Sequence, residues 1–157
     1  MYIDAHTHLD YFKENIDKAI EDINKNKILT LANSMDIDSY LLNKEYGKRS
    51  EYIIPCFGIH PWRAGSFSGE LEELIPYIEE SKFIGEIGLD YYWDENPPRD
   101  VQKDAFRAQM KLAEDMNLPV VIHDRDAHAD TLEIIKEFPN VVGVVHCFSG
   151  SVEFAKE

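Results

Sequence analysis

The sequence predicts an α/β fold: a TIM-type (β/α) barrel, of which about six of the usual eight βα units are present. Six short apolar runs alternate with helical patterns along the 157 residues, and such runs are typical of parallel strands buried on both faces. Ligating side chains follow several of these runs. An open doubly wound sheet gathers ligands mainly at one switch point, whereas a closed or nearly closed barrel brings many strand ends together, so the barrel is favoured.

Three strands and three helices are expected in the first half of the chain. The strands cover a first run that ends in residues 4–8, then 28–32 and 53–59, with Pro55 marking the start of the third because proline cannot donate to a strand ladder. Apolar residues at helical spacing predict helices at 14–26 and 38–48, the second with Asp38 as N-cap and Leu41, Leu42 and Tyr46 facing inward. Ser68 is expected to cap a third helix, in which Pro76 predicts a kink or two short pieces.

The second half repeats this alternation. Strands are expected at 83–89, 119–122 and 141–145, and a long helix at 100–116. Another helix is expected to bury Thr131, Ile134, Ile135 and Phe138. Ser149 or Ser151 is expected to cap a last helix.

Composition excludes several classes of protein. The chain is 44% hydrophobic and 29% charged, with a net charge of −14, which argues against a broad basic surface for nucleic acid but not against a nuclease whose metals meet the phosphates. Cys56 and Cys147 lie in apolar runs and are expected to be small buried hydrophobes, so no disulfide is expected and a cytoplasmic location fits. No signal peptide or membrane span is predicted, and no membrane partner is expected.

Histidines and carboxylates mark the candidate site. His6 and His8 are expected on one face of the first strand, where two neutral imidazoles can hold a divalent ion. Glu86 lies inside an apolar strand, where an unpaired carboxylate is costly to bury and therefore needs a cation. The remaining candidates share a position at the end of a different strand: His60, Asp90, His123 and His146.

Several segments, taken together, resemble the TatD family of metal-dependent deoxyribonucleases, within the amidohydrolase-like barrels. They are Asp4-Ala5-His6-Thr7-His8-Leu9-Asp10, Gly58-Ile59-His60-Pro61, Ile84-Gly85-Glu86-Ile87-Gly88-Leu89-Asp90-Tyr91, the helix residues Gln102, Phe106, Gln109, Leu112 and Ala113, Pro119-Val120-Val121-Ile122-His123-Asp124-Arg125-Asp126-Ala127, and His146-Cys147-Phe148-Ser149-Gly150. The match follows the family order along essentially the whole chain.

The resemblance implies a hydrolase that cleaves phosphodiester bonds in DNA with a metal-activated water. Two divalent ions (Zn, Mn or Mg) are implied: His6, His8 and Glu86 hold one, and Glu86 bridges to a second held by His123 and His146. Paired ions activate a water and stabilise the attacking and leaving oxygens.

Further residues are candidates for catalysis or substrate binding. Glu86, His60 and Arg125 are the catalytic candidates. His60 either contacts substrate or closes its loop. Arg125 either clamps a phosphate or pairs with Asp124 or Asp126, and the amides of Ser149 and Gly150 are expected to meet a phosphate at the start of the last helix.

Other residues near the strand ends are candidates either for a supporting role at the site or for a purely structural role. Asp90 is favoured as a hydrogen-bond partner of a ligand histidine. His128 is expected to face solvent or cap its helix. The aromatic residues of this region either stack on bases or pack at the rim; they are Trp62, Tyr91, Tyr92 and Trp93.

The sequence departs from the family pattern in length. We expect residues 1–157 to be one TatD-like hydrolase domain without the last two βα units, and the family's remaining metal-binding aspartate, from the final strand, has no counterpart here. A fragment, a natural truncation and a barrel completed by another chain all remain open. Open barrel edges predict self-association. Two other functions remain open: an amidohydrolase-like enzyme acting on a small ester or amide, and a metal-binding relative without turnover.

Overall fold

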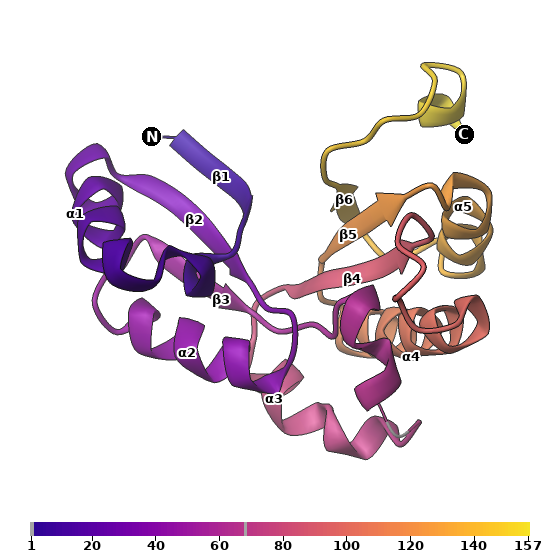
Figure 1. Ribbon diagram of the computed structural model, residues 1–157, viewed down its shortest axis with the longest axis horizontal. Helices are drawn as coiled ribbons and strands as arrows, with labels where there is room; N and C mark the ends of the chain where they lie inside the picture. Colours follow the sequence, from indigo (N-terminus) through magenta and orange to yellow (C-terminus); the bar gives the residue numbers. More distant parts are fainter. Residues whose placement is uncertain (1, 68) are drawn as a thin grey trace.

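Six parallel strands follow one another in chain order around a curved arc (Figure 1). The computed structural model describes residues 2–67 and 69–157. One three-stranded sheet contains β1 (Tyr2–Thr7), β2 (Ile28–Asn33) and β3 (Ile53–Cys56). The other contains β4 (Ile84–Asp90), β5 (Val120–Arg125) and β6 (Gly143–Val145). All neighbouring strands within the two sheets pair in parallel.

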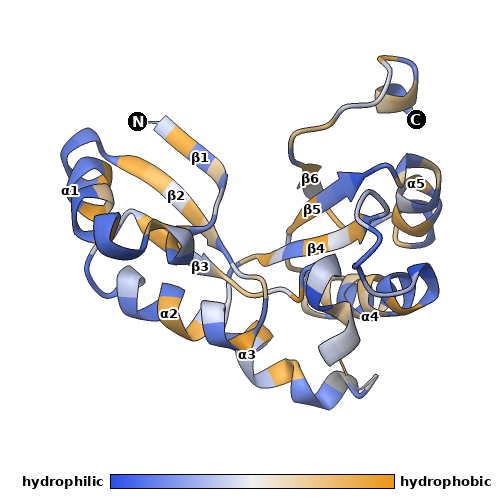
Figure 2. Cartoon of the chain, viewed as in Figure 1, coloured by the Kyte–Doolittle hydropathy of each residue, from blue (hydrophilic) through white to orange (hydrophobic). Residues whose placement is uncertain are grey.

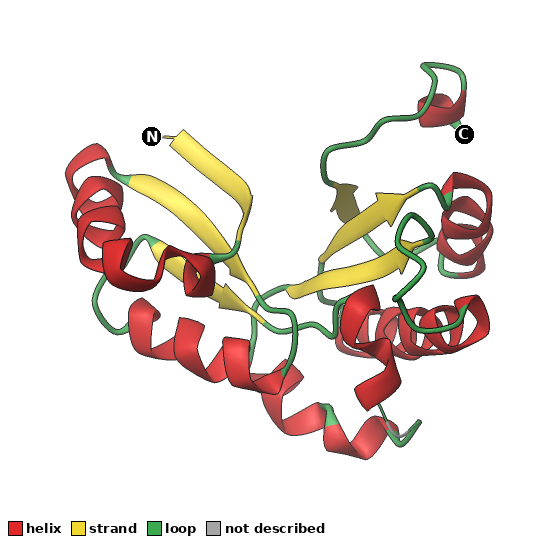
Figure 3. Ribbon diagram, in the orientation of Figure 1, coloured by secondary structure: helices red, strands yellow, loops and turns green. Residues whose placement is uncertain are grey.

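Helices cover the outer side of the arc and leave its inner side to the strands (Figure 3). The α-helices are α1 (Ile16–Asn26), α2 (Ile37–Gly47), α3 (Ile75–Glu80), α4 (Arg99–Met116) and α5 (His128–Glu137). Short 3-10 helices lie at Leu9–Asn15, Pro61–Ser66, Leu71–Glu73 and Phe154–Lys156. In the part of the chain that the structure describes, no helix is long and apolar enough to cross a bilayer.

The two sheets meet where β3 gives way to β4. A single bridge joins Phe57 to Ile84, and the Gly85 N–H donates to the Phe57 carbonyl at 2.8 Å. Gly58 makes this approach possible, because a Cβ on it would lie 2.7 Å from the Gly85 carbonyl carbon. The strands therefore form one continuous arc from β1 to β6, which is the partial barrel that the sequence predicts.

The main core lies between the strands and the helices that cover them (Figure 2). Phe57, Ile87 and Phe106 are fully buried there, and each such side chain stabilises the fold by about 1.5–3 kcal/mol. In Figure 2 most of β2 and the start of β5 are orange, in agreement with apolar runs in the sequence, whereas the end of β5 is blue. This core fixes the strand ends from which the site is built.

The register predicted for the second helix is wrong. α2 begins one residue earlier, and Asp36, not Asp38, is its N-cap: Asp36 accepts from the Ser39 N–H at 3.0 Å, while the Ser39 hydroxyl accepts from the Asp36 N–H. This reciprocal pair is a capping box. The helix buries Tyr40 and Asn43, whereas Leu41 and Leu42 are exposed.

Three other predictions are corrected. Pro55 lies inside β3, paired with Ala32; it is tolerated because β3 is an edge strand of its three-stranded sheet. Cys56 is buried as expected, but Cys147 is exposed. In the described residues no α-helix starts at Ser149 or Ser151, and one short 3-10 turn, Phe154–Lys156, forms instead.

The helix predicted after Ser68 is split in two. Leu71–Glu73 forms one turn and α3 begins at Ile75, with Pro76 in its first turn, where a missing N–H costs nothing. The predicted interruption is confirmed. Ser68 itself lies outside the described residues.

Candidate metal centre

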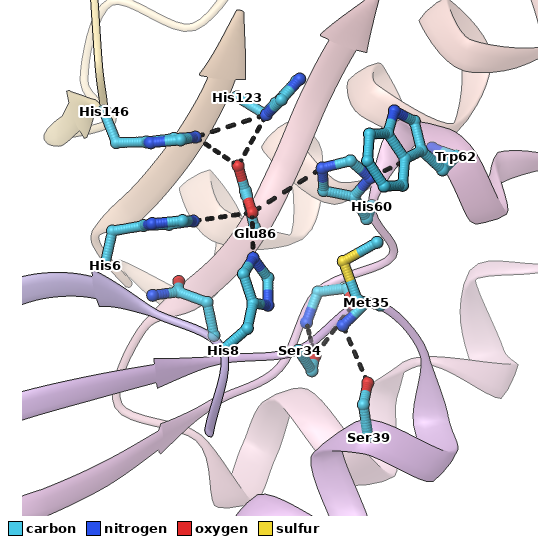
Figure 4. Close-up of polar contacts among 12 residues, drawn as sticks. His6, His8, Ser34, Met35, Ser39, His60, Trp62, Glu86, His123 and His146 are labelled. Atoms are coloured by element: carbon cyan, nitrogen blue, oxygen red, sulfur yellow. Dashed lines mark hydrogen bonds and ion pairs between the residues drawn. The ribbon is translucent and has the colours of Figure 1, made fainter. Parts of the chain in front are cut away.

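Glu86 lies at the centre of the candidate site (Figure 4). It is 1% exposed and comes from the middle of β4. Its Oε2 lies 2.8 Å from Nε2 of His6 and 2.8 Å from Nε2 of His8. Its Oε1 lies 2.8 Å from Nδ1 of His123 and 2.5 Å from Nε2 of His146. The carboxylate therefore divides its two oxygens between histidines of the first sheet and histidines of the second.

The backbone around Glu86 is fixed by the junction of the two sheets. Its N–H donates to the Ser34 carbonyl at 3.2 Å, just beyond β2. The Ser34 hydroxyl accepts from the Gly58 N–H at 2.8 Å and donates to the Gly58 carbonyl at 2.9 Å. Residues following β2, β3 and β4 thus hold one another, and they place the carboxylate at the centre of the arc.

Charge and burial oppose each other at Glu86. Burial alone raises the pKa of Glu86, but the hydrogen bonds from His123, His146, His6 and His8 outweigh it and hold that pKa well below its usual range. Among the described residues, only histidines lie within ion-pair distance of Glu86. The buried carboxylate is therefore ionised and surrounded by groups that accept a proton or a metal ion.

The first sheet supplies His6 and His8. His6 lies in β1 and His8 just after it, with ring centroids 4.8 Å apart. Alternation along the strand leaves the two side chains on one face, as the His-x-His spacing predicts. Both present Nε2 to the same oxygen of Glu86.

The second sheet supplies His123 and His146, and Asp90 is hydrogen-bonded to His123. The Nε2 of His123 lies 2.9 Å from Oδ2 of Asp90, which also accepts from the Trp62 indole N–H at 2.8 Å. Burial lowers the pKa of His123, but Glu86 and Asp90 outweigh it and raise the pKa above its usual value. The hydrogen bond expected between Asp90 and a ligand histidine is present. It is made to a ring that the carboxylates on both sides orient.

His60 faces the same carboxylate from farther away. Its Nε2 lies 3.7 Å from Oε2 of Glu86, and its Nδ1 accepts a hydrogen bond from the backbone N–H of Trp62 at 3.2 Å. Burial lowers the pKa of His60 to about 3. At neutral pH the ring is therefore uncharged, and because Nδ1 accepts a hydrogen bond, its proton is on Nε2 and points into the site.

These residues fit a divalent cation. Donor atoms of His6, His8 and Glu86 lie within 4.8 Å of one another, and so do those of His60, Glu86 and His123. Mixed imidazole and carboxylate donors suit zinc, manganese and related ions. Two ring nitrogens, Nδ1 of His8 and Nδ1 of His146, are buried and have no hydrogen-bond partner among the described residues. These are the ring nitrogens opposite the ones that face Glu86; the nitrogens that fit a cation are Nε2 of His6, His8 and His146 and Nδ1 of His123, which all gather at the one carboxylate.

A polar pocket of about 360 Å³ adjoins this centre beside His146. Arg125 and Ser149 line it, as do two acidic residues, Asp124 and Asp126. Arg125 does not pair with either acid among the contacts of the described chain; its guanidinium lies 4.0 Å from the centre of the Tyr92 ring and 5.7 Å from that of Trp93. Arg125 is therefore placed by aromatic stacking and is exposed beside the site.

The last helix expected to begin at Ser149 and Gly150 is absent from the described residues, so a phosphate contact by these residues stays a prediction without the helix start on which it was based. Ser149 and Gly150 lie in irregular chain after β6, and their amides do not begin a helix. The Ser151 hydroxyl accepts from the Phe154 N–H at 3.1 Å and thereby caps the short turn. Ser149 remains beside the pocket, but not with the helix-terminal amides that favour an anion.

His128 and Tyr91 have structural partners. His128 is the first residue of α5 and neither caps the helix, whose N-cap is Ala127, nor faces solvent freely: it is half-buried, and its Nδ1 lies 2.6 Å from Oδ2 of Asp124. The Tyr91 hydroxyl donates to Asp130 at 2.7 Å. Trp62 binds Asp90 and so supports the site. The rings of Tyr92 and Trp93 remain half exposed near Arg125.

Sequence reasoning missed how the site is braced. Ser34, whose hydroxyl holds Gly58, was not singled out, because a serine after an apolar strand carries no recognisable pattern. Gln109 carries part of the family resemblance but no role in the sequence analysis, although an amide among apolar helix residues is itself a signal that a buried partner exists.

Comparison with known proteins shows which family the chain resembles. The family model described as TatD related DNase matches residues 3–157. The uncharacterized metal-dependent hydrolase YabD of Bacillus subtilis is 36% identical, covering 100% of this chain and 64% of the relative. The uncharacterized metal-dependent hydrolase MJ1582 of Methanocaldococcus jannaschii is 32% identical over 99% of this chain and 63% of its own length.

A solved structure shows the same fold. The crystal structure of YJJV, a TatD homolog from Escherichia coli, superimposes with a TM-score of 0.86 at 27% identity, covering 99% of this chain and 63% of that one. The chain thus spans slightly less than two thirds of the length of these relatives. The six-stranded arc matches the corresponding part of the YJJV structure, as a partial α/β barrel does. From the match along nearly its whole length, we conclude that this chain belongs to the TatD-related DNase family of metal-dependent hydrolases.

Proposed function

We propose that the Glu86 centre holds two divalent cations and hydrolyses phosphodiester bonds in DNA. The observation that carries this proposal is the arrangement of Glu86, with one oxygen directed at His6 and His8 and the other at His123 and His146. A carboxylate shared in this way suits a pair of ions. The DNase in the name of the matching family model supports DNA as the substrate.

The chemistry supplied by bound ions is well defined. Divalent cations lower the pKa of a water molecule and offset the charge that develops on phosphoryl oxygens. Four histidines and Glu86 hold the cations on this proposal: His6, His8, His123 and His146. The neutral ring of His60 supplies an Nε2–H donor, placed to bind a phosphoryl oxygen rather than to take up a proton at neutral pH.

Substrate enters beside the metal centre on this proposal. The pocket of about 360 Å³ next to His146 carries Arg125, whose exposed guanidinium is the candidate phosphate contact. Asp124 and Asp126 in the same pocket repel an anion, and the whole chain has a net charge of −14. Phosphate binding must therefore depend on the bound cations.

The test is cleavage of short single-stranded and double-stranded DNA by the 157-residue chain with Mg²⁺, Mn²⁺ or Zn²⁺. The expected result is cleavage that EDTA abolishes and that a His6→Ala, His123→Ala double variant lacks. Undiminished cleavage by the double variant overturns the assignment of the site. Hydrolysis of small esters or amides without DNA cleavage overturns the substrate class, and metal binding without any turnover overturns the enzymatic activity.

A further inference from the structure

Two buried glutamines lie on the same side of α4. Gln102 and Gln109 are each 1% exposed. They are seven residues apart, just under two helical turns, so their side chains leave the helix in nearly the same direction. The helix packs against β4 and against the turn that follows His60. A primary amide buried in such a position must find partners for all its hydrogen-bonding groups.

Gln109 binds the backbone of one residue at both of its polar groups. Its Oε1 accepts from the Ile59 N–H at 2.7 Å, and its Nε2 donates to the Ile59 carbonyl at 3.1 Å. Nε2 of Gln109 also donates its other hydrogen to the Ala105 carbonyl, at 3.1 Å. Ile59 directly precedes His60, so this pair of bonds fixes the chain from which the His60 ring projects.

Gln102 binds Asp90 in the same manner. Its Oε1 accepts from the Asp90 N–H at 2.8 Å, and its Nε2 donates to the Asp90 carbonyl at 3.0 Å and to the Pro97 carbonyl at 2.8 Å. Asp90 is fully buried, and its carboxylate binds His123 at 2.9 Å. This second pair of bonds therefore fixes the residue that orients His123.

The reason for these contacts lies in the sheet junction. β3 ends at Cys56, and in the described residues a single bridge, from Phe57 to Ile84, joins the two sheets as a strand ladder would. Beyond it, no strand pairing joins Ile59 to Asp90 in the described residues, so their buried backbone groups need other partners on these sides. A glutamine amide presents the same C=O and N–H groups as a neighbouring strand, and each of the two replaces that missing strand at one residue.

We propose that Gln102 and Gln109 are positioning residues: Gln102 sets the His123 ring through Asp90, and Gln109 sets the His60 ring through Ile59. The proposal concerns the chain's own geometry and is testable without metal. Its consequence for metal and substrate rests on the proposed function, in which His123 is a ligand and His60 meets the substrate.

The first test is amide hydrogen exchange of the metal-free protein, measured for wild type, Gln102→Met and Gln109→Met. Methionine keeps the shape of the side chain but removes its hydrogen bonds. Gln102→Met is expected to accelerate exchange at Asp90 by 10-fold or more without changing Ile59, and Gln109→Met is expected to do the reverse. Leu112→Ala, a buried residue of the same helix with no hydrogen-bonding side chain, serves as the control and is expected to change both amides equally.

The second test separates positioning from general stability. In Gln102→Met, the ring ¹⁵N signals of His123 are expected to shift while those of His60 stay, and the Mn²⁺ affinity is expected to fall 10-fold or more. In Gln109→Met the His60 signals move instead, and the Mn²⁺ affinity stays within 3-fold. Gln102→Glu and Gln109→Glu retain one acceptor; they are expected to restore part of the amide protection and replace any methionine variant that does not fold.

Two outcomes overturn the proposal: parallel changes at both amides in each glutamine variant, or ring signals that do not move in either. Failure of the wild-type protein to bind Mn²⁺ contradicts the proposed function instead. It leaves the exchange and ring-signal measurements as the test of the two glutamines.

Discussion

At the scale of single residues, Glu86 and Asp90 combine burial with hydrogen bonds that keep carboxylates ionised. Burial raises the pKa of Asp90, but hydrogen bonds from the Trp62 indole, the Tyr92 N–H and His123 outweigh it and lower that pKa. Asp90 therefore presents a negative charge to the side of His123 that faces away from Glu86. Carboxylates placed behind a ligand histidine fix its ring and raise its basicity.

Asp90→Asn is expected to weaken metal binding about 10- to 100-fold, because the His123 ring loses its charged partner. Isothermal titration of the metal-free protein with Mn²⁺ measures this. Asp94→Asn, an exposed residue in the loop after β4, is the matched control and is expected to bind as wild type does. An unchanged affinity in Asp90→Asn would contradict the supporting role of Asp90.

The lowered pKa of His60 predicts that the stability of the metal-free protein depends on pH. Its folded pKa, lowered to about 3, lies below the usual unfolded value of about 6.5. As the pH falls below about 6.5 the unfolded chain therefore takes up a proton that the folded chain refuses, and stability falls. The raised pKa of His123 changes the free energy of unfolding only above about pH 6.5, where its stabilising contribution is lost as the pH rises. The lowered pKa of Glu86 changes the free energy of unfolding only below about pH 4.5, where its contribution is lost as the pH falls.

Between pH 6.5 and 5, His60 is expected to remove about 2 kcal/mol from the free energy of unfolding, at about 1.4 kcal/mol per pH unit. Denaturant unfolding of wild type and His60→Gln at both pH values measures the difference, and the variant is expected to lose about that much less. Equal losses in the two proteins would show that His60 is protonated alike in both states.

At the scale of elements, the sequence predicted the strands well because parallel strands buried on both faces read as apolar runs. It failed where one residue decided a boundary. The start of α2 depends on the hydrogen bond that the Asp36 carboxylate accepts from the Ser39 N–H. The sequence does not distinguish Asp36 from Asp38, because aspartate is an equally good N-cap residue at either position. Pro55 was misplaced because the sequence does not reveal which strand is an edge.

Asp36→Ala is expected to destabilise the protein by about 1 kcal/mol, because the first turn of α2 loses its capping box. Thermal unfolding measures the effect. Asp38→Ala removes an exposed carboxylate of the same turn and is expected to cost less, since Asp38 contributes through the helix dipole alone. A larger loss in Asp38→Ala would mean that the sequence-based N-cap was the functional one.

At the scale of the molecule, the site was more predictable than its supports. The metal candidates recur at strand ends, where a barrel gathers its chemistry, so their convergence on Glu86 followed from topology. The bracing by Ser34, Gln102 and Gln109 depends on where strands diverge, which no local pattern records. The last turn was misjudged because residues beyond β6 extend away from the arc in Figure 1, with little packing to support a helix.

The open side of the arc predicts self-association of the 157-residue chain. β1 and β6 are the outer strands of the arc, and apolar residues at these edges are largely exposed: Ile3 is 65% exposed and Val142, just before β6, is 74% exposed. Unpaired apolar edges pair with other chains. Analytical ultracentrifugation is expected to show concentration-dependent association that an Ile3→Lys, Val142→Lys variant lacks.

Val152→Lys is the control for this experiment, because Val152 is exposed but lies outside the strands. It is expected to associate as wild type does. A wild-type chain that stays monomeric across the concentration range would contradict pairing through the open edges.

We propose that two bound cations would share Glu86, and titration of the metal-free protein with Mn²⁺ is the measurement that decides this. Wild type is expected to bind two ions in unequal steps, because Asp90 supports the His123 ring, whereas His6 and His8 have no such carboxylate besides Glu86 among the contacts of the described residues. Glu86→Gln keeps the shape of the side chain but removes its charge, and is expected to weaken both steps at least 100-fold, the equivalent of about 2.7 kcal/mol. Two ions bound by Glu86→Gln with wild-type affinity would show that the two cations do not share Glu86.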